Sequence, residues 1–345
     1  MATLTRETAE TAQEIRELAA RLKTHRQHPC LLFVSRSIQH ADVLAVRTAL
    51  GDEAGDHLDL IVSSPGGDIE AAYLVVRELR RRFQKLVVFI PFRAKSAATL
   101  VCLAADALIL GSLGELGPLD MQYDQKQQAD SPVSTSRLLV YAACNELQYG
   151  ATKMYDDLVG RLSNQSGMRL FDACSKAAEL TSALFGPLYG HIDPARLGES
   201  AEGLEIGAQY AERLLKRYRA AFWAAQGSKI LDRLIYGYPT HGFIIDQEEV
   251  QELGLPMTLP DDQEAALLDR LALALIEFGT EQDLIALAGH SRETIAAAQK
   301  VLDGLPEPAE RTPPVSSNRR QRHGRKPSGK GGRIAGRWQQ AAGSQ

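Results

Sequence analysis

The chain has 345 residues and a mass of 37.7 kDa, a length that suggests about two domains at roughly 150 residues each. Hydrophobic residues make up 44% and charged residues 24% of the sequence, a balance that excludes a wholly disordered protein. No apolar run reaches the length of about 18 residues that a membrane helix needs, and the polar N-terminus resembles no targeting peptide. We therefore expect a chain without a membrane span that resides in the cytoplasm.

The charge is unevenly distributed along the chain. The formal net charge is -4, but residues 305–345 contain nine Lys or Arg and two Glu, about +7, which leaves about -11 for the remainder. An acidic body argues against a nucleic-acid-binding domain. The Pro-, Gly- and Arg-rich tail is predicted to be disordered and to contact acidic partners or nucleic acid weakly.

The cysteines follow no pattern of metal binding or disulfide chemistry. Their spacing matches neither a CxxC pair nor a zinc pattern, so we expect free thiols in a reducing compartment, and no metal or cofactor. The four positions are Cys30, Cys102, Cys144 and Cys174.

Strands and helices alternate over the first third of the chain. Residues 29–120 contain four short apolar runs separated by helical segments, which predicts a parallel sheet with right-handed helical crossovers. In chain order the expected elements are a helix at 5–27, a strand at 30–34, a helix at 40–50, a strand at 58–62, a helix at 68–82, a strand at 86–90, a helix from 96 and a strand at 107–110.

The rest of the chain reads as mostly helical. We expect a loop at 121–133, helices over 134–237, a loop with a short helix and an edge strand at 238–258, and two helices within 262–303. The predicted organisation is an N-terminal helix (1–27), a main domain (28–258), C-terminal helices (259–304) and the tail (305–345).

The first motif is Ser64-Pro65-Gly66-Gly67-Asp68, at the end of the strand at 58–62. Such a stretch is commonly only a turn that leads into a helix. Two glycines would also let bare backbone approach a substrate, with the amide of Gly67 aimed at a developing oxyanion.

The second motif is Ala94-Lys95-Ser96-Ala97-Ala98-Thr99, which follows the next strand and opens a helix. Ser96 is either the N-cap of that helix or a nucleophile whose neighbour Ala97 supplies a second oxyanion amide. Both motifs lie at the carboxyl ends of neighbouring strands, where open α/β sheets place their sites.

Two further segments complete a pattern. Leu113–Asp120 (LGELGPLD) alone is a rigid turn, and Tyr238–Asp246 (YPTHGFIID) contains a loop histidine. Together with SPGGD and with KSA about 29 residues later, they resemble the serine dehydrogenase proteinase family of the Clp-protease/crotonase superfold, which is related to signal-peptide peptidase A. The block LYGHIDPARLGE also resembles that family, and one departure is Ala98, where the family usually has Gly.

This resemblance implies a spiral of ββα units with a parallel sheet, followed by a C-terminal helical region, and a serine endopeptidase that forms homo-oligomeric rings. It implies Ser96 as nucleophile and backbone amides of Gly66, Gly67 and Ala97 as the oxyanion hole. The residues leave the general base open. We favour His241, and the alternatives are Lys95, Lys153 and His191.

Two other functions fit the same fold. A crotonase-like acyl-CoA enzyme would use the two amides to hold an enolate and would need a carboxylate base. A catalytically silent scaffold would form rings and bind partners through the basic tail.

Overall fold

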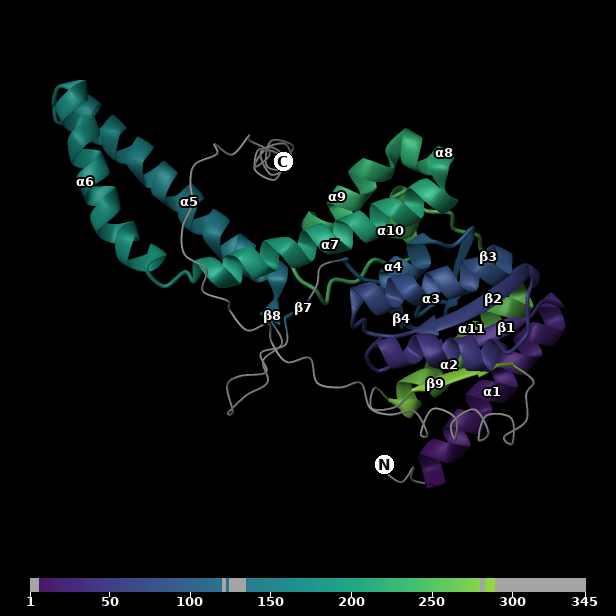
Figure 1. Cartoon of the computed structure of the whole chain (residues 1–345). Coiled ribbons are helices and arrows are strands. Elements are labelled where there is room, and N and C mark those ends of the chain that lie inside the picture. The colour runs from purple at the N-terminus through teal and green to yellow at the C-terminus, as the bar shows by residue number, and fades with distance from the viewer. Residues whose placement is uncertain (1–5, 120–121, 124–134, 280–282, 289–345) are drawn as a thin grey trace, which may run out of the picture. The chain divides into compact units, whose positions relative to one another are not determined.

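A five-stranded sheet forms the centre of the protein (Figure 1). The computed structural model describes residues 6–119, 122–123, 135–279 and 283–288, all within the first of the two units, Met1–Gln299, into which the chain divides. The sheet has the order β5-β3-β2-β1-β9, and its first four strands are parallel. A mixed α/β fold with a mostly parallel sheet is thereby confirmed, while the spiral of ββα units stays a prediction. The strands are β1 (Cys30–Val34), β2 (Gly55–Ser63), β3 (Phe83–Ile90), β5 (Ala107–Leu110) and β9 (Leu284–Leu287).

Helices cover both faces of the sheet, so each central strand is buried on both sides. Along β1, Leu31 and Phe33 pack into a core with α2 (His40–Leu50), α3 (Ile69–Arg82) and α4 (Ala97–Leu103). The alternate residues, such as Leu32, pack into a second core with α1 (Arg6–Arg26) and α11 (Asp262–Phe278). A strand with apolar residues on both faces reads as a continuous apolar run, which explains why CLLFV was recognisable in the sequence.

A helical region follows the parallel strands and confirms the helical content expected from residue 134 onward. Within it, α5 packs against both α6 and α7. The elements are α5 (Arg137–Gly160), the π-helical turn η1 (Arg161–Gln165), α6 (Leu170–Tyr189), α7 (Pro194–Tyr218), α8 (Ala220–Phe222), the π-helical turn η2 (Trp223–Gly227), α9 (Ser228–Tyr236) and α10 (Gln247–Glu252). Four short strands lie in the connections: β4 (Arg93–Ala94), β6 (Glu115–Leu116), β7 (Gln122–Tyr123) and β8 (Thr135–Ser136).

The C-terminal part differs from the expected pair of helices. After α11 the chain forms β9, which pairs antiparallel with β1 so that Leu31 faces Leu287 and Val34 faces Leu284. The sequence of β9, LIAL, is an apolar run too short to distinguish a strand from a helix by periodicity. Residues 289–345, which include the tail predicted to be disordered, lie outside the described residues.

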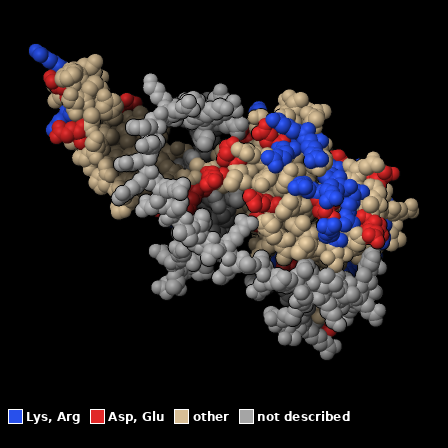
Figure 2. Space-filling model, in the orientation of Figure 1, with Lys and Arg blue, Asp and Glu red and all other residues tan. Residues whose placement is uncertain are grey.

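Basic side chains gather on one side of the surface (Figure 2). They come from the C-terminal parts of α3 and α7, two helices that pack together. Among the exposed ones are Arg77, Arg81, Arg213, Lys216 and Arg217. The negative balance outside the tail therefore coexists with a local basic surface. Within the described ranges, no helix is long and apolar enough to cross a membrane.

Candidate active site

The two glycine- and serine-containing motifs lie side by side. The N–H of Ser64 donates to the carbonyl of Arg93 at 2.9 Å, and the N–H of Lys95 donates to the carbonyl of Ser64 at 3.1 Å. These bonds form a parallel bridge between Ser64 and Ala94. Motifs that the sequence placed at the ends of β2 and β3 are thus joined edge to edge just beyond those strands.

Ser96 has an unusual backbone conformation. It occupies the N-cap position of α4 with φ 54° and ψ -119°, yet its side chain does not cap the helix. A positive φ in a residue with a Cβ is uncommon, and such outliers cluster at sites where strain serves a function. The side chain is held at this sharp strand-to-helix turn with only 4% of the residue exposed. The sequence's simpler reading, a hydroxyl that caps the helix, does not describe what this side chain does.

The two glycines fit tightly around Ser96. Gly66 has φ 117° and Gly67 has φ 140°, values that side chains rarely allow. A Cβ on Gly66 would lie 2.7 Å from the Cβ of Ser96, and a Cβ on Gly67 would lie 2.5 Å from the carbonyl oxygen of Ile38. Each glycine is therefore required by close packing as well as by its backbone angles.

The backbone amides near Ser96 are not equivalent. The N–H of Gly66 donates to the hydroxyl of Ser64 at 3.1 Å. Within the part of the chain that the structure describes, the N–H groups of Gly67 and Ala97 have no acceptor. The geometry consequently favours Gly67 and Ala97 over Gly66 as the pair of donors available to a substrate oxygen.

The glycine-rich segment after β5 wraps the same turn. The N–H of Ser96 donates to the carbonyl of Pro118 at 3.2 Å. The hydroxyl of Thr99 donates to the carbonyls of Gly117 at 2.8 Å and of Ala94 at 3.0 Å. These bonds hold the beginning of α4 between two loops, so the conformation of Ser96 is determined from both sides.

Lys95 extends from residues 94–97, here called the serine turn, to the segment that contains His241. Its ammonium lies 2.9 Å from a carboxylate oxygen of Glu115 and donates to the carbonyl of Gly242 at 3.0 Å. The same segment is bridged to β6, because the N–H of Leu116 donates to the carbonyl of Ile245 at 2.9 Å. Lys95, the residue before Ser96, is therefore bonded to Gly242, the residue after His241. Ser96 and His241 are 145 positions apart in the sequence.

This placement argues against Lys95 as the base. A general base has to direct its nitrogen at the nucleophile, whereas Nζ of Lys95 is directed at the carboxylate of Glu115 and the carbonyl of Gly242. The positioning role of Lys95 was not visible in the sequence, where only its adjacency to Ser96 could be read.

The two remaining candidates for the base lie elsewhere. Lys153 is exposed on α5, and His191 is exposed in the turn after α6. Among the described residues, neither side chain forms a hydrogen bond or an ion pair with the serine turn. Of the residues considered from the sequence, the structure thus brings together Ser96, Gly66, Gly67, Ala97, Lys95 and the segment of His241.

The free cysteines do not offer an alternative nucleophile. Cys30 and Cys102 are fully buried, and burial raises the pKa of both thiols well above the usual range. A thiol that stays protonated in an apolar interior is inert. Cys144 and Cys174 are also free, but they lie on α5 and α6, away from the serine turn.

A cavity of about 170 Å³ adjoins the site. Ser63 and Pro65, on either side of Ser64, contribute to its wall together with Arg93, and Arg36 lines it as well. Burial lowers the pKa of Arg93 from its ordinary value, although Glu115 opposes this shift. The hollow next to the glycine motif therefore carries two guanidinium groups.

Comparison with known proteins agrees with the resemblance read from the motifs. Residues 25–136 match the family model of the ClpP-like SDH-type serine proteinases, which confirms that resemblance over this segment. The matched segment includes Gly66, Gly67 and Ser96 and ends before His241.

Two curated relatives from Methanocaldococcus jannaschii are similar to the chain. Uncharacterized protein MJ0137 is 26% identical over 201 residues, which are 54% of this chain and 65% of that protein. Uncharacterized protein MJ1495 is 37% identical over 164 residues, 46% of this chain and 54% of that protein. The chain thus spans less than two thirds of the length of either relative. No solved structure matches the chain.

Proposed function

We propose that the chain is a serine endopeptidase with Ser96 as its nucleophile. The observation that carries this proposal is the backbone of Ser96, held at φ 54° beside Gly66 while its hydroxyl leaves the helix uncapped. A serine on a sharp, strained strand-to-helix turn is the arrangement that positions a nucleophilic hydroxyl in other hydrolase folds. The match of residues 25–136 to a serine proteinase family supports the same chemistry.

The proposed reaction uses each of these groups in turn. The Oγ of Ser96 attacks the carbonyl carbon of the substrate peptide while its proton passes to the base. The N–H groups of Gly67 and Ala97 donate hydrogen bonds to the oxyanion that forms, an interaction worth several kcal/mol per donor in comparable enzymes. The intermediate then collapses, the amine leaves with the proton held by the base, and water hydrolyses the acyl-enzyme by the same steps.

His241 is the base that this arrangement supports best. Lys95 and the bridge between Leu116 and Ile245 anchor its segment to the serine turn. Imidazole is the side chain that most often serves as a general base near neutral pH. A crotonase-like reaction would instead need a free carboxylate at the site, whereas Glu115 is paired with Lys95.

We further infer that the protein is a homo-oligomer. One face of α6 carries Leu180, Leu184 and Leu188 at intervals of four residues, with exposed fractions of 38%, 59% and 46%, and this stripe continues the one that begins with the buried Ala173 and Ala177. Residues four apart lie on one face of a helix, and a row of exposed leucines is typical of an interface. Light scattering on the full chain is expected to give a mass several times 37.7 kDa. A monomeric mass would contradict this inference.

Labelling with a fluorophosphonate tests the nucleophile directly. The reagent is expected to modify Ser96 in the wild-type chain, as mapped by mass spectrometry, and Ser96→Ala and Ser96→Gly should both prevent labelling and cleavage of casein. The two variants differ in backbone preference, because only glycine adopts a φ of 54° without strain. We expect Ser96→Gly to be more stable than Ser96→Ala by about 1–2 kcal/mol.

The two variants serve as controls for each other. If both stay folded and neither cleaves casein, loss of activity reports the missing hydroxyl rather than loss of structure. Unchanged cleavage by Ser96→Ala, in a preparation free of other proteases, would exclude the proposed mechanism.

A further inference from the structure

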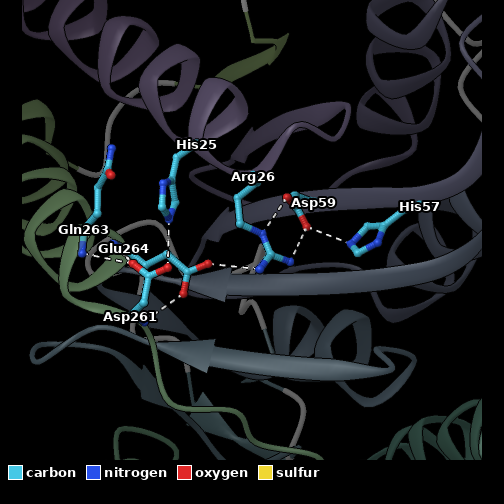
Figure 3. A network of polar contacts seen from close by, with 7 residues as sticks. All are labelled: His25, Arg26, His57, Asp59, Asp261, Gln263 and Glu264. Carbon is cyan, nitrogen blue, oxygen red and sulfur yellow. Dashed lines mark hydrogen bonds and ion pairs between the residues drawn. The ribbon is translucent and has the colours of Figure 1, made fainter.

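A second cluster of ionisable side chains joins α1, β2 and the start of α11 (Figure 3). His25 and Arg26 end α1, whereas Asp261 and Glu264 begin α11. Asp59 reaches the cluster from β2, where it pairs with the first residue of β1. The serine turn follows the opposite, carboxyl ends of these strands, so the cluster is a separate site.

Arg26 and Asp59 neutralise each other within the cluster. Both nitrogens of one side of the guanidinium contact the two carboxylate oxygens of Asp59, Nε at 3.1 Å and Nη2 at 3.3 Å. Asp59 is completely buried and also accepts a hydrogen bond from the ring of His57 at 3.0 Å. Asp59 therefore largely balances the charge of Arg26, although Arg26 also contacts Glu264.

The remaining groups form a triad of metal-binding type. His25 Nε2, Asp261 Oδ2 and a carboxylate oxygen of Glu264 all lie within 4.8 Å of one another. His25 and Asp261 are reachable from solvent, with side chains 26% and 54% exposed, while the side chain of Glu264 is 5% exposed. With a neutral imidazole, the triad carries a charge of -2, which a divalent cation would balance.

We propose that His25, Asp261 and Glu264 bind a zinc ion that fastens α1 to α11. Zn²⁺ binds imidazole nitrogens and carboxylate oxygens, and water occupies the fourth position of sites that have three protein ligands. A nitrogen ligand favours such a transition metal over Mg²⁺ or Ca²⁺, which select oxygen ligands.

The present contacts leave room for this coordination. His25 Nε2 lies 2.8 Å from Asp261 Oδ2, and two ligands of a tetrahedral zinc ion with bonds of about 2.0–2.1 Å lie about 3.3 Å apart. If these two atoms move apart by roughly half an ångström, the ion fits between them. It then replaces the hydrogen that His25 and Asp261 share.

The backbone hydrogen bonds to these two carboxylates form the capping box of α11, and they also fix the positions of the oxygens that would bind the ion. Glu264 accepts from Arg26 at 3.0 Å and from the backbone N–H of Asp261 at 3.0 Å, and Asp261 accepts from two backbone N–H groups through its other oxygen. A carboxylate has about four lone-pair positions, so these bonds leave some free. Ligating carboxylates are commonly held by such second partners.

The test is metal binding by the full chain without an affinity tag. Equilibrium dialysis is expected to give one Zn²⁺ per chain, and Co²⁺ should produce the strong visible absorption of a tetrahedral site. His25→Ala and Glu264→Gln are expected to weaken binding at least 100-fold, because even outer partners of a metal ligand contribute 10- to 100-fold. Zinc should raise the melting temperature of the wild-type chain but of neither variant.

His40→Ala is the matched control. His40 lies 3.8 Å from Asp68 and is exposed, so it forms a similar histidine–carboxylate pair without a buried glutamate, and its loss should leave zinc binding unchanged. Glu264→Gln retains an oxygen that can accept from Arg26, and melting without metal will verify that the variants are folded. Absence of stoichiometric binding in the wild type, or equal binding in His25→Ala, would overturn the proposal.

Discussion

Ser96 is the residue on which the candidate site depends. A non-glycine residue in this part of conformational space costs about 1–3 kcal/mol, and the surrounding structure has to enforce it. Here the carbonyl of Pro118 accepts from Ser96, and the carbonyl of Lys95 accepts from Ala98, on either side of the strained bond. These hydrogen bonds offset the strain and hold the hydroxyl in a direction that an unstrained helix start would not produce.

The glycines beside Ser96 give a test at the same scale. Gly67→Ala is expected to slow fluorophosphonate labelling about 10²-fold or more, because it would displace one oxyanion donor. It should also lower the free energy of unfolding by at least about 1–3 kcal/mol, since an alanine at φ 140° is strained and its Cβ meets the backbone of Ile38. Urea unfolding and labelling rates measure the two effects separately.

A second glycine serves as the control for this substitution. Gly55, at the start of β2, has open space around its Cβ position, so Gly55→Ala should change neither the labelling rate nor the stability substantially. Wild-type labelling by Gly67→Ala would show that the motif is only a turn.

Among the elements, β4 and β6 have an importance out of proportion to their length. Each has two residues, yet they lie between the glycine motif, the serine turn and the segment 241–245. Lys95 follows β4 directly, and Glu115 begins β6. The pair of strands β4 and β6 is here called the ribbon. The ion pair between Lys95 and Glu115 crosses it and orients the ammonium toward Gly242.

Replacement of Lys95 tests whether this ribbon positions the base. Lys95→Met is expected to lower kcat about 10²-fold with little change in KM, because a displacement of about 1 Å at a catalytic group can cost that much. Lys95→Arg should retain part of the activity, since a guanidinium can still donate to the carbonyl of Gly242. Steady-state kinetics on a fluorescent peptide separates kcat from KM.

Lys85→Met is the control, because Lys85 is exposed on β3. If His241→Ala kept wild-type rates while Lys95→Met and Lys95→Arg lost all activity, Lys95 itself would be the base. A wild-type rate that rises only above about pH 8 would support the same conclusion.

The sequence predicts the elements of this fold better than the detail of its site. The runs CLLFV and LDLIV are recognisable as strands because their burial on both faces leaves no polar position except Asp59. The strain at Ser96 leaves no such trace, because Ser-Ala-Ala also begins ordinary helices. The partnership of Lys95 with Gly242 and that of Arg26 with Asp59 join distant segments, and a single sequence carries no signal for such pairs.

At the scale of the whole molecule, acid is expected to destabilise the fold through His57. Its ring stacks on His28 and contacts Asp59, and the positive charge of Lys85 lowers the pKa of the ring. Burial lowers the pKa of His57 below its ordinary value of 6.5, against the opposing effect of Asp59. Below that ordinary value the unfolded chain binds more protons than the folded chain, so the free energy of unfolding decreases as the pH falls through about 6.5.

Urea unfolding at pH 7.5 and 5.5 measures this effect. His57→Gln keeps a donor for Asp59 but cannot take up a proton, and it should therefore reduce the loss of stability between the two pH values. An equal loss in the variant and the wild type would show that other groups account for the acid sensitivity.

The position of β9 also determines when the molecule can be completed during translation. Leu284 follows its partner Val34 by 250 residues, which a ribosome takes about 10–50 s to add at 5–20 residues per second. Until then one side of β1 presents unpaired N–H and C=O groups, the template on which chains aggregate. A nascent chain that ends at Gly279 has the serine turn and all four parallel strands, but the edge of β1 stays open to pairing with another chain until β9 is added.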